Sequence, residues 1–444
     1  MLRRFSAYLI LVAMLGVLFT AACRHVIPDR PRPKDSGWLE SVCPDPSNTK
    51  KKRVLVAGQR ILCAHGNRRG YPRWIFQASE RIVSTPKPGL GDALFISSLD
   101  RTLYAIDTNG NKKWSFQTAD LVVSSPAATP DGTVYIAAKN GMLYAVDRGG
   151  ASKWKPPYDA VHKITSSPKV STDNTIFIAT HAAKLLAISE YRTKKWEYEG
   201  TDSFVKSTPE FSTDSLTIYI GSKDGYLHAV RTTDNLPNTQ ERHRWRKKVC
   251  DKITASPAVG PDDTIYLGCW NGKVLAIRPN GSIKWSFRTG KPILATPRIG
   301  PDQTIYVGSD SMWFYAIRNG KCKWRFRTGI YKKGTPKSEE DKDTVEDGTN
   351  IDTCDAQIPP ETDPKFYVVK GSPAYIQASA ALSSKNIIYF GSINENLYAV
   401  SRQGNLLWSF DAQGWVDNAP IIWTDGTKES LFVAAGSRLY SMNP

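Results

Sequence analysis

The chain has 444 residues and carries 59 lysines and arginines against 42 aspartates and glutamates, a formal net charge of +17 at pH 7. A charge this large suits an acidic partner, lipid head groups or a polyanionic sugar. Nucleic acid is disfavoured as a partner because the chain begins with an export signal. Beyond that signal no segment shows helical periodicity, which excludes an all-α fold.

The first 22 residues are predicted to be a signal peptide. Two arginines in 1–4 precede an apolar run over 7–22, and Cys23 follows two alanines. The run resembles a bacterial lipoprotein signal, whose cleavage exposes a cysteine that is then lipid-modified. Thr20 departs from that pattern, which usually has leucine there. An ordinary cleaved signal and an uncleaved anchor are the alternatives, although the run is short for a transmembrane helix.

Residues 23–52 are rich in proline and charge and are predicted to be a tether between a lipidated Cys23 and the folded part. Arg24 follows the cysteine. In enteric-type bacteria an aspartate at this place favours the inner membrane. By resemblance, we therefore expect a lipid-anchored protein on the periplasmic side of the outer membrane.

Tryptophan then recurs about every forty residues within one repeated pattern, which signals a supersecondary unit copied many times. From Trp114 the unit contains KWSF, SSPAA, TVYIAA and LYAVD, which we label strands d, a, b and c. Pro-Asp-Gly and Asn-Gly between the strands predict tight turns. Eight tryptophans mark strand d: Trp74, Trp114, Trp154, Trp196, Trp245, Trp285, Trp324 and Trp408.

Stacking four-stranded antiparallel sheets around an axis predicts an all-β, eight-bladed β-propeller over residues 53–444. Only one b-c pair lies between Trp324 and Trp408, so we interpret 332–371 as an acidic loop insertion rather than a blade. We expect the last blade to combine strands from both ends of the chain. An extra b-c pair over 54–64 leaves open which pair completes that blade.

The repeat KW-x-F-x-T, SSP, PDGT-(V/I)-Y and LYA(V/I) resembles the pyrroloquinoline-quinone-type (PQQ-like) propeller repeat. In that family the outer-strand tryptophan docks between adjacent blades, so the resemblance implies a structural role for all eight tryptophans. Repeated aspartates at the a-to-b hairpin, Asp131, Asp173, Asp214, Asp262 and Asp302, suit turns that bond their own backbone, not catalysis.

Within this family, quinoprotein dehydrogenases bind the quinone and calcium and often contain a disulfide between adjacent cysteines, which this chain lacks. The outer-membrane barrel-assembly lipoproteins of the BamB type are eight-bladed, lipid-anchored scaffolds, and this chain resembles them in length, signal, tether and blade number. The basic charge, the added cysteines and the acidic insertion depart from that pattern. The resemblance therefore implies a partner in the envelope without identifying it.

Six cysteines remain besides Cys23, which suits an oxidising compartment. Cys250 lies where strand d leads to strand a, and Cys269 ends strand b of the same blade. Both connections belong to one face, so we predict a Cys250–Cys269 disulfide. Sequence leaves the pairing of four cysteines open: Cys43, Cys63, Cys322 and Cys354.

A basic run over 242–248 is the candidate contact patch, formed by Arg242, Arg244, Arg246, Lys247 and Lys248. The favoured interpretation is a solvated outer strand. The six histidines have no zinc spacing, and no nucleophile elbow or phosphate-binding glycine loop appears.

We therefore predict no catalytic, cofactor or metal site. The function expected is a non-enzymatic scaffold for protein–protein interaction in the cell envelope, in outer-membrane barrel assembly. The alternatives are a PQQ- and calcium-dependent oxidoreductase and a surface adhesin or polysaccharide-binding protein.

Overall fold

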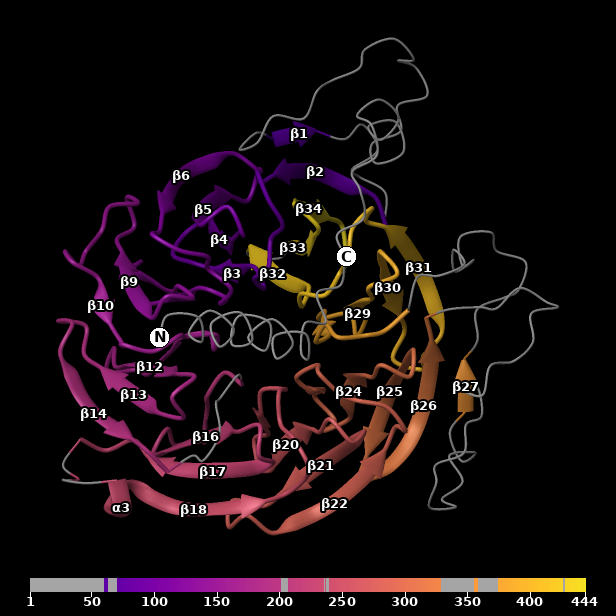
Figure 1. Ribbon diagram of the computed structural model, residues 1–444. Coiled ribbons are helices and arrows are strands. Elements are labelled where there is room, and N and C mark those ends of the chain that lie inside the picture. The colour runs from indigo at the N-terminus through magenta and orange to yellow at the C-terminus, as the bar shows by residue number, and fades with distance from the viewer. Residues whose placement is uncertain are drawn as a thin grey trace, which may run out of the picture. The chain divides into compact units, whose positions relative to one another are not determined.

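The computed structural model describes residues 60–62, 70–200, 207–234, 236, 239–328, 355–357, 374–425 and 428–444. Eight antiparallel sheets follow one another around an axis and form an eight-bladed β-propeller, as predicted (Figure 1). Within the described residues the one helix is the four-residue α3 (Thr239–Arg242). The signal, the tether and Cys23 lie outside the described residues.

The blades are numbered in chain order, and the strands of each are given from the axis outward. Blade 1 has β3 (Lys87–Pro88), β4 (Ala93–Ser97), β5 (Thr102–Asp107) and β6 (Lys112–Gln117); blade 2 has β7 (Ala127–Ala128), β8 (Val134–Ala137), β9 (Met142–Val146) and β10 (Tyr158–Asp159); blade 3 has β11 (Lys169–Val170), β12 (Ile176–Ala179), β13 (Leu185–Ile188) and β14 (Lys194–Tyr198); blade 4 has β15 (Glu210–Phe211), β16 (Thr217–Gly221), β17 (Tyr226–Arg231) and β18 (His243–Lys248).

Blade 5 has β19 (Ala258–Val259), β20 (Ile265–Gly268), β21 (Lys273–Ile277) and β22 (Ile283–Arg288); blade 6 has β23 (Arg298–Ile299), β24 (Ile305–Gly308), β25 (Trp313–Arg318), β26 (Lys321–Arg327) and β27 (Asp355–Gln357); blade 7 has β28 (Ala381–Leu382), β29 (Ile388–Gly391), β30 (Asn396–Val400) and β31 (Leu406–Asp411); blade 8 has β32 (Ile421–Asp425), β33 (Lys428–Ala435), β34 (Arg438–Met442), β2 (Pro72–Gln77) and β1 (Arg60–Leu62).

Blade 8 closes the ring with strands from both ends of the chain, as expected. The C-terminal pair β33 and β34 supplies strands b and c, and β2, which contains Trp74, is strand d. From the extra pair predicted over 54–64, β1 joins as a fifth, outermost strand antiparallel to β2. The described residues thus settle which pair completes the blade.

The acidic insertion also contributes an outer strand. Within 332–371, which we interpreted as a loop, β27 pairs in parallel with β26 and becomes the fifth strand of blade 6. A strand edge exposes unpaired N–H and C=O groups, and an added strand covers them. The insertion therefore extends the sheet of blade 6 at 355–357.

Blade 2 departs from the pattern at Trp154. We predicted strand d at this tryptophan, but the outer strand β10 begins only at Tyr158, and Ser152 makes an isolated bridge to Val146. Two prolines follow, Pro156 and Pro157, which lack the N–H that a ladder needs. The prediction of a strand at Trp154 is therefore wrong.

The apolar core consists of the contacts between neighbouring blades. One cluster joins Phe95 and Leu103 of blade 1 to Ile136 and Val146 of blade 2, and equivalent clusters occur around the ring. Both faces of each sheet are covered in this way, which removes from water the apolar side chains that alternate along every strand.

The repeated tryptophans hold the blades together, as the resemblance implied. In every blade the ring lies against an aromatic side chain of strand b, with centroids 5.4–6.0 Å apart. Five of them also donate Nε1–H to a carbonyl in the c-d turn of the next blade, 2.7–3.0 Å away: Trp74, Trp114, Trp154, Trp245 and Trp324. Each such tryptophan spans two blades.

Candidate functional site

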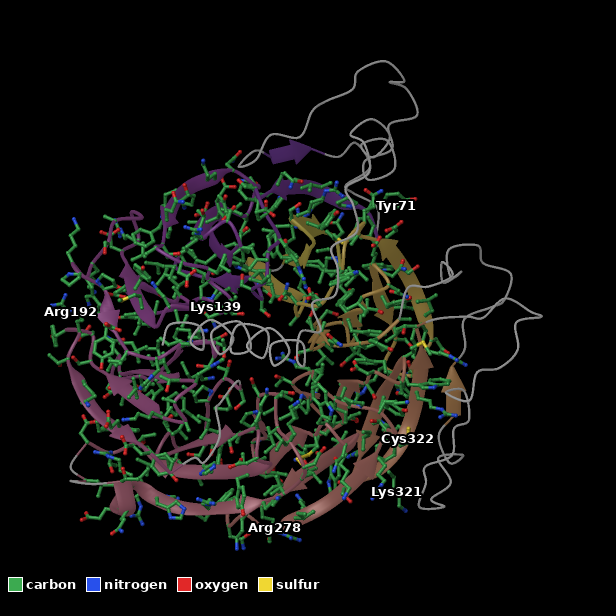
Figure 2. The ribbon with its side chains drawn as sticks, viewed as in Figure 1. Tyr71, Lys139, Arg192, Arg278, Lys321 and Cys322 are labelled. Carbon is green, nitrogen blue, oxygen red and sulfur yellow. A yellow bond between two sulfur atoms is a disulfide. The ribbon has the colours of Figure 1, made fainter. Side chains whose placement is uncertain are left out.

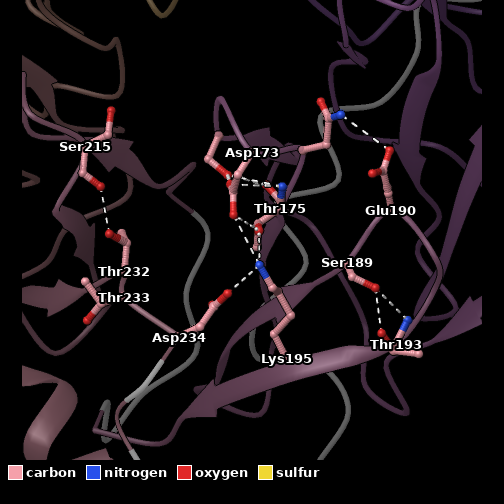
Figure 3. Close-up of polar contacts among 12 residues, drawn as sticks. Asp173, Thr175, Ser189, Glu190, Thr193, Lys195, Ser215, Thr232, Thr233 and Asp234 are labelled. Carbon is pink, nitrogen blue, oxygen red and sulfur yellow. Dashed lines mark hydrogen bonds and ion pairs between the residues drawn. The ribbon is translucent and has the colours of Figure 1, made fainter.

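One face of the propeller carries the a-b and c-d turns, and its aspartates serve the backbone. Asp173 accepts the N–H of Thr175 and the hydroxyl of Thr175, and Lys195 of the same blade reaches Asp173 and Asp234 of the next blade (Figure 3). Hydrogen bonds from turn hydroxyls are also present at Asp131, Asp214 and Asp262. These carboxylates are structural, as predicted.

The pKa values of these aspartates are lowered, which keeps the carboxylates ionised. Burial opposes the shift at Asp173, but hydrogen bonds from Ser171, Thr175 and Lys195 lower its pKa to about 2. The pKa of Asp131 is lowered chiefly by the hydroxyl of Thr129, and that of Asp302 is lowered by Arg402 against the effect of burial. A carboxylate held in this way cannot take up a proton near neutral pH.

The opposite face carries the d-a connections and the b-c turns. In six blades the second residue of the b-c turn donates its N–H to a carbonyl of the d-a connection, at 2.8–3.1 Å. The residues at this turn position are Leu99, Lys139, His181, Trp270, Asp310 and Ile393. Lys139 lies towards the inner side of the ring, whereas Arg192 and Arg278 lie at its outer margin (Figure 2).

Trp270 is the departure from this repeat. Its side chain is 39% exposed, and it is the one tryptophan among the described residues in the exposed class. The ammonium of Lys252 lies 3.6 Å from the ring centroid, and the Trp270 N–H is bonded to the Lys252 carbonyl at 3.0 Å. A cation over an indole is attracted by the negative face of the ring. The pair therefore presents one charged and one apolar group together.

A disulfide fixes this pair. Cys250 of the d-a connection is bonded to Cys269 of the b-c turn, with the Cα atoms 6.2 Å apart, as predicted from the topology. Lys252 and Trp270 each lie within two residues of a bridged cysteine. Cys322 is also disulfide-bonded, whereas Cys43, Cys63 and Cys354 lie outside the described residues.

Blade 4 continues this surface. The guanidinium of Arg246 lies 4.5 Å from the ring centroid of Tyr226, and the Lys248 ammonium 5.9 Å from it. The Val249 N–H is bonded to the Gly225 carbonyl beside the disulfide. We call the set Tyr226, Arg246, Lys248, Lys252 and Trp270 the Trp270 patch.

The basic strand is only partly as predicted. Arg244, Lys247 and Lys248 are exposed, which fits a solvated outer strand. Arg242, however, is 2% exposed and donates hydrogen bonds to the carbonyls of 233, 234 and 236. Its guanidinium lies over Trp196 at 4.3 Å. Arg242 therefore does not belong to an exposed contact patch, because α3 directs its side chain towards Trp196 of blade 3.

Asp310 is a titratable group of this face with a raised pKa, as is Asp417 in the d-a connection that leads into blade 8. Burial raises the pKa of Asp310 to about 6, and a hydrogen bond from Gln377 opposes that shift. Asp310 occupies the same turn position in blade 6 as Trp270 in blade 5. Sequence gives no signal for either residue, because this turn position holds a different residue in each of the six blades.

The described residues contain no group of three or more His, Cys, Asp or Glu able to hold a metal ion. His228 replaces the tyrosine of the repeat. It is fully buried between blades, with its Nδ1 atom 3.4 Å from the hydroxyl of Tyr198 in the preceding blade. In the part of the chain that the structure describes, no helix is long and apolar enough to cross a membrane.

Solved structures share this architecture. BamB from Moraxella catarrhalis superposes with a TM-score of 0.56 at 15% identity, covering 83% of this chain and 98% of that one. The computationally designed Ika8 protein superposes with a TM-score of 0.59 at 12% identity, again covering 83% and 98%. At such identities the likeness concerns the fold alone. No curated protein sequence matches the chain significantly.

A family profile described as outer membrane protein assembly factor BamB matches residues 42–237 and 234–350. These matches cover most of the chain, including the first five blades, strands β23 to β26 of blade 6 and the residues of the Trp270 patch. The chain belongs to the PQQ-like propeller family of BamB type.

Proposed function

We propose that this protein is a non-enzymatic, lipid-anchored scaffold for protein–protein interaction that acts in β-barrel assembly at the periplasmic side of the outer membrane. The observation that carries the proposal is the family match over 42–237 and 234–350. The departures noted in the sequence, the basic charge above all, bear on which envelope protein is bound.

The Trp270 patch is the contact surface that we propose for that partner. Interface hot spots are enriched in tryptophan, tyrosine and arginine, with their neighbours excluding water. The patch combines these side chains, and the disulfide holds Lys252 and Trp270 in place before binding. Such preorganisation lowers the entropy lost on association. An acidic and partly apolar partner surface is complementary to it.

Site-specific photocrosslinking tests the contact. A benzophenone amino acid at position 270 is expected to crosslink to outer-membrane assembly proteins in envelope membranes. The same probe at Leu407, which is 47% exposed on the outer strand of blade 7, is the matched control. Equal crosslinking at both positions, or none to assembly proteins at 270, would contradict the proposed surface.

Recovery of a sugar polymer with the protein, without assembly proteins, would favour an adhesin instead. Saturable binding of pyrroloquinoline quinone with calcium, measured by absorbance, would contradict the non-enzymatic assignment. For the anchor, Cys23→Ser is expected to move the protein from the membrane fraction to the soluble fraction. Retention of that variant in the outer membrane would count against lipidation.

A further inference from the structure

The innermost strands carry a second set of charged residues, independent of the Trp270 patch. The first residues of these strands occupy equivalent positions. Each is paired with an aromatic residue of strand b in its own blade. We call this set the inner ring: Lys87, Ala127, Lys169, Glu210, Ala258, Arg298, Ala381 and Ile421. Three of its members are cations and one is an anion.

The charges of the inner ring are not balanced. Lys169 of blade 3 forms an ion pair with Glu210 of blade 4, with the Lys169 ammonium 2.6 and 2.8 Å from the two carboxylate oxygens. The Lys87 ammonium of blade 1 has no hydrogen bond or ion pair to any described residue, although the charge of Glu210 acts on it. Between Lys87 and Lys169 lies blade 2, where the ring residue is Ala127. The alanine side chain places no charged or polar group between Lys87 and Lys169 in the inner ring.

Two hydroxyl groups lie next to this part of the inner ring. The Thr85 N–H is bonded to the Ser125 hydroxyl oxygen at 2.9 Å, and the Ser125 N–H is bonded to that of Ser167 at 2.9 Å. Ser125 and Ser167 lie two residues before Ala127 and Lys169, in the segments that lead into β7 and β11. Each hydroxyl accepts one bond and donates none to a described residue. Both therefore retain an O–H donor.

Electrostatics supports the same conclusion. The pKa of Lys87 is lowered by burial first and by the charge of Lys169 second, with Glu210 acting in the opposite direction. Lys87 is nevertheless accessible to solvent, so an incoming group can reach it. The cost of holding the Lys87 charge there falls when an anion arrives, because opposite charges at short range favour the ionised form.

We propose that the inner ring binds a carboxylate or phosphate oxyanion between Lys87 and Lys169, over Ala127 and beside the Ser125 hydroxyl. The two ammonium groups supply charge, and the hydroxyl supplies a directed hydrogen bond. Charge-assisted bonds of this kind are the stronger class of hydrogen bond. The site goes beyond the proposed function, because it uses no residue of the Trp270 patch.

Calorimetric titration of the full-length protein with inorganic phosphate and, separately, with citrate tests the site. Saturable binding is expected for at least one probe, and binding of citrate alone would identify a carboxylate ligand. Lys87→Gln is expected to weaken binding at least tenfold and Ser125→Ala several-fold, whereas Lys139→Gln on the patch face leaves it unchanged. Circular dichroism and thermal unfolding establish that each variant is folded.

Absence of binding of both probes to the wild-type protein would overturn the proposal. Unchanged affinity in folded Lys87→Gln would overturn it as well. Neither result bears on crosslinking at position 270, so the inner ring and the proposed function fail separately.

Discussion

Replacing Asp310 by asparagine is expected to stabilise the protein at neutral pH. Burial raises the pKa of this carboxyl from 3.8 to about 6. A raised carboxyl pKa means that the folded state prefers the protonated form. Its stabilising contribution is complete below pH 3.8 and is lost as the pH rises through about 6. Asparagine keeps the shape and the acceptor for Gln377 without the charge.

The shift sets an upper limit on the effect, about 3 kcal/mol, because one pKa unit corresponds to about 1.4 kcal/mol. Solvent reaches part of the carboxyl and screens it, so we expect about 1–2 kcal/mol at pH 7.5. The measurement is the free energy of unfolding in denaturant for wild type and Asp310→Asn between pH 4 and pH 8.

The difference between the two proteins is expected to grow in favour of asparagine between about pH 4 and about pH 6.5, and then to level off. Other groups titrate in both proteins and cancel in this difference. A difference that is constant across this range would refute the assignment. Lower stability of Asp310→Asn at pH 7.5 would refute it too.

Three further substitutions test the repeat. Asp173→Asn is expected to lower the free energy of unfolding at pH 7. Because hydrogen bonds lower the pKa of Asp173, this loss of stability should shrink as the pH falls from the usual aspartate range towards about 2, and a pH-independent loss in unfolding titrations would contradict this. Trp324→Phe should cost about 1 kcal/mol more than Trp408→Phe in chemical denaturation, because Trp324 donates to the Arg402 carbonyl whereas the buried Trp408 Nε1 has no partner among the described residues. Equal costs would count against the docking bond. Gly225→Ala should lower the melting temperature far more than Gly91→Ala, since both glycines have positive φ but only at Gly225 would a Cβ meet a carbonyl oxygen, that of Cys250, at 2.0 Å; similar melting temperatures would exclude the steric explanation.

The fold could be predicted because the repeat signals are local. Each blade repeats the same hairpin turns and the same tryptophan, so periodicity specifies the sheets and their number. The closing blade was ambiguous because β1 and β34 belong to segments with the same apolar pattern. The structure distinguishes them by position: β34 pairs with the inner side of β2, whereas β1 pairs with its outer side. The strand predicted at Trp154 does not form, because Pro156 and Pro157 lack the backbone N–H groups that pairing would need.

The site was less accessible from sequence. Cys250 and Cys269 could be paired because both connections share one face of a known topology. Arg242 could not be separated from the basic run, because its burial depends on α3 turning the chain back towards Trp196. Lys87 and Lys169 attract no notice in sequence, since they lie far apart along the chain and are brought together by the ring.

The composition of blade 8 has a consequence for folding while the chain is being made. Leu94 of blade 1 and Leu397 of blade 7 pack against opposite faces of this blade. A chain that emerges with its N-terminus first can form seven blades before its last strands are made. The outer faces of blade 1 and blade 7 are then exposed to solvent until 428–442 has arrived. During that interval the nascent protein exposes two apolar surfaces. The time before the C-terminal strands arrive therefore governs the risk that two incomplete chains associate, and a chaperone that covers either exposed blade would lower that risk.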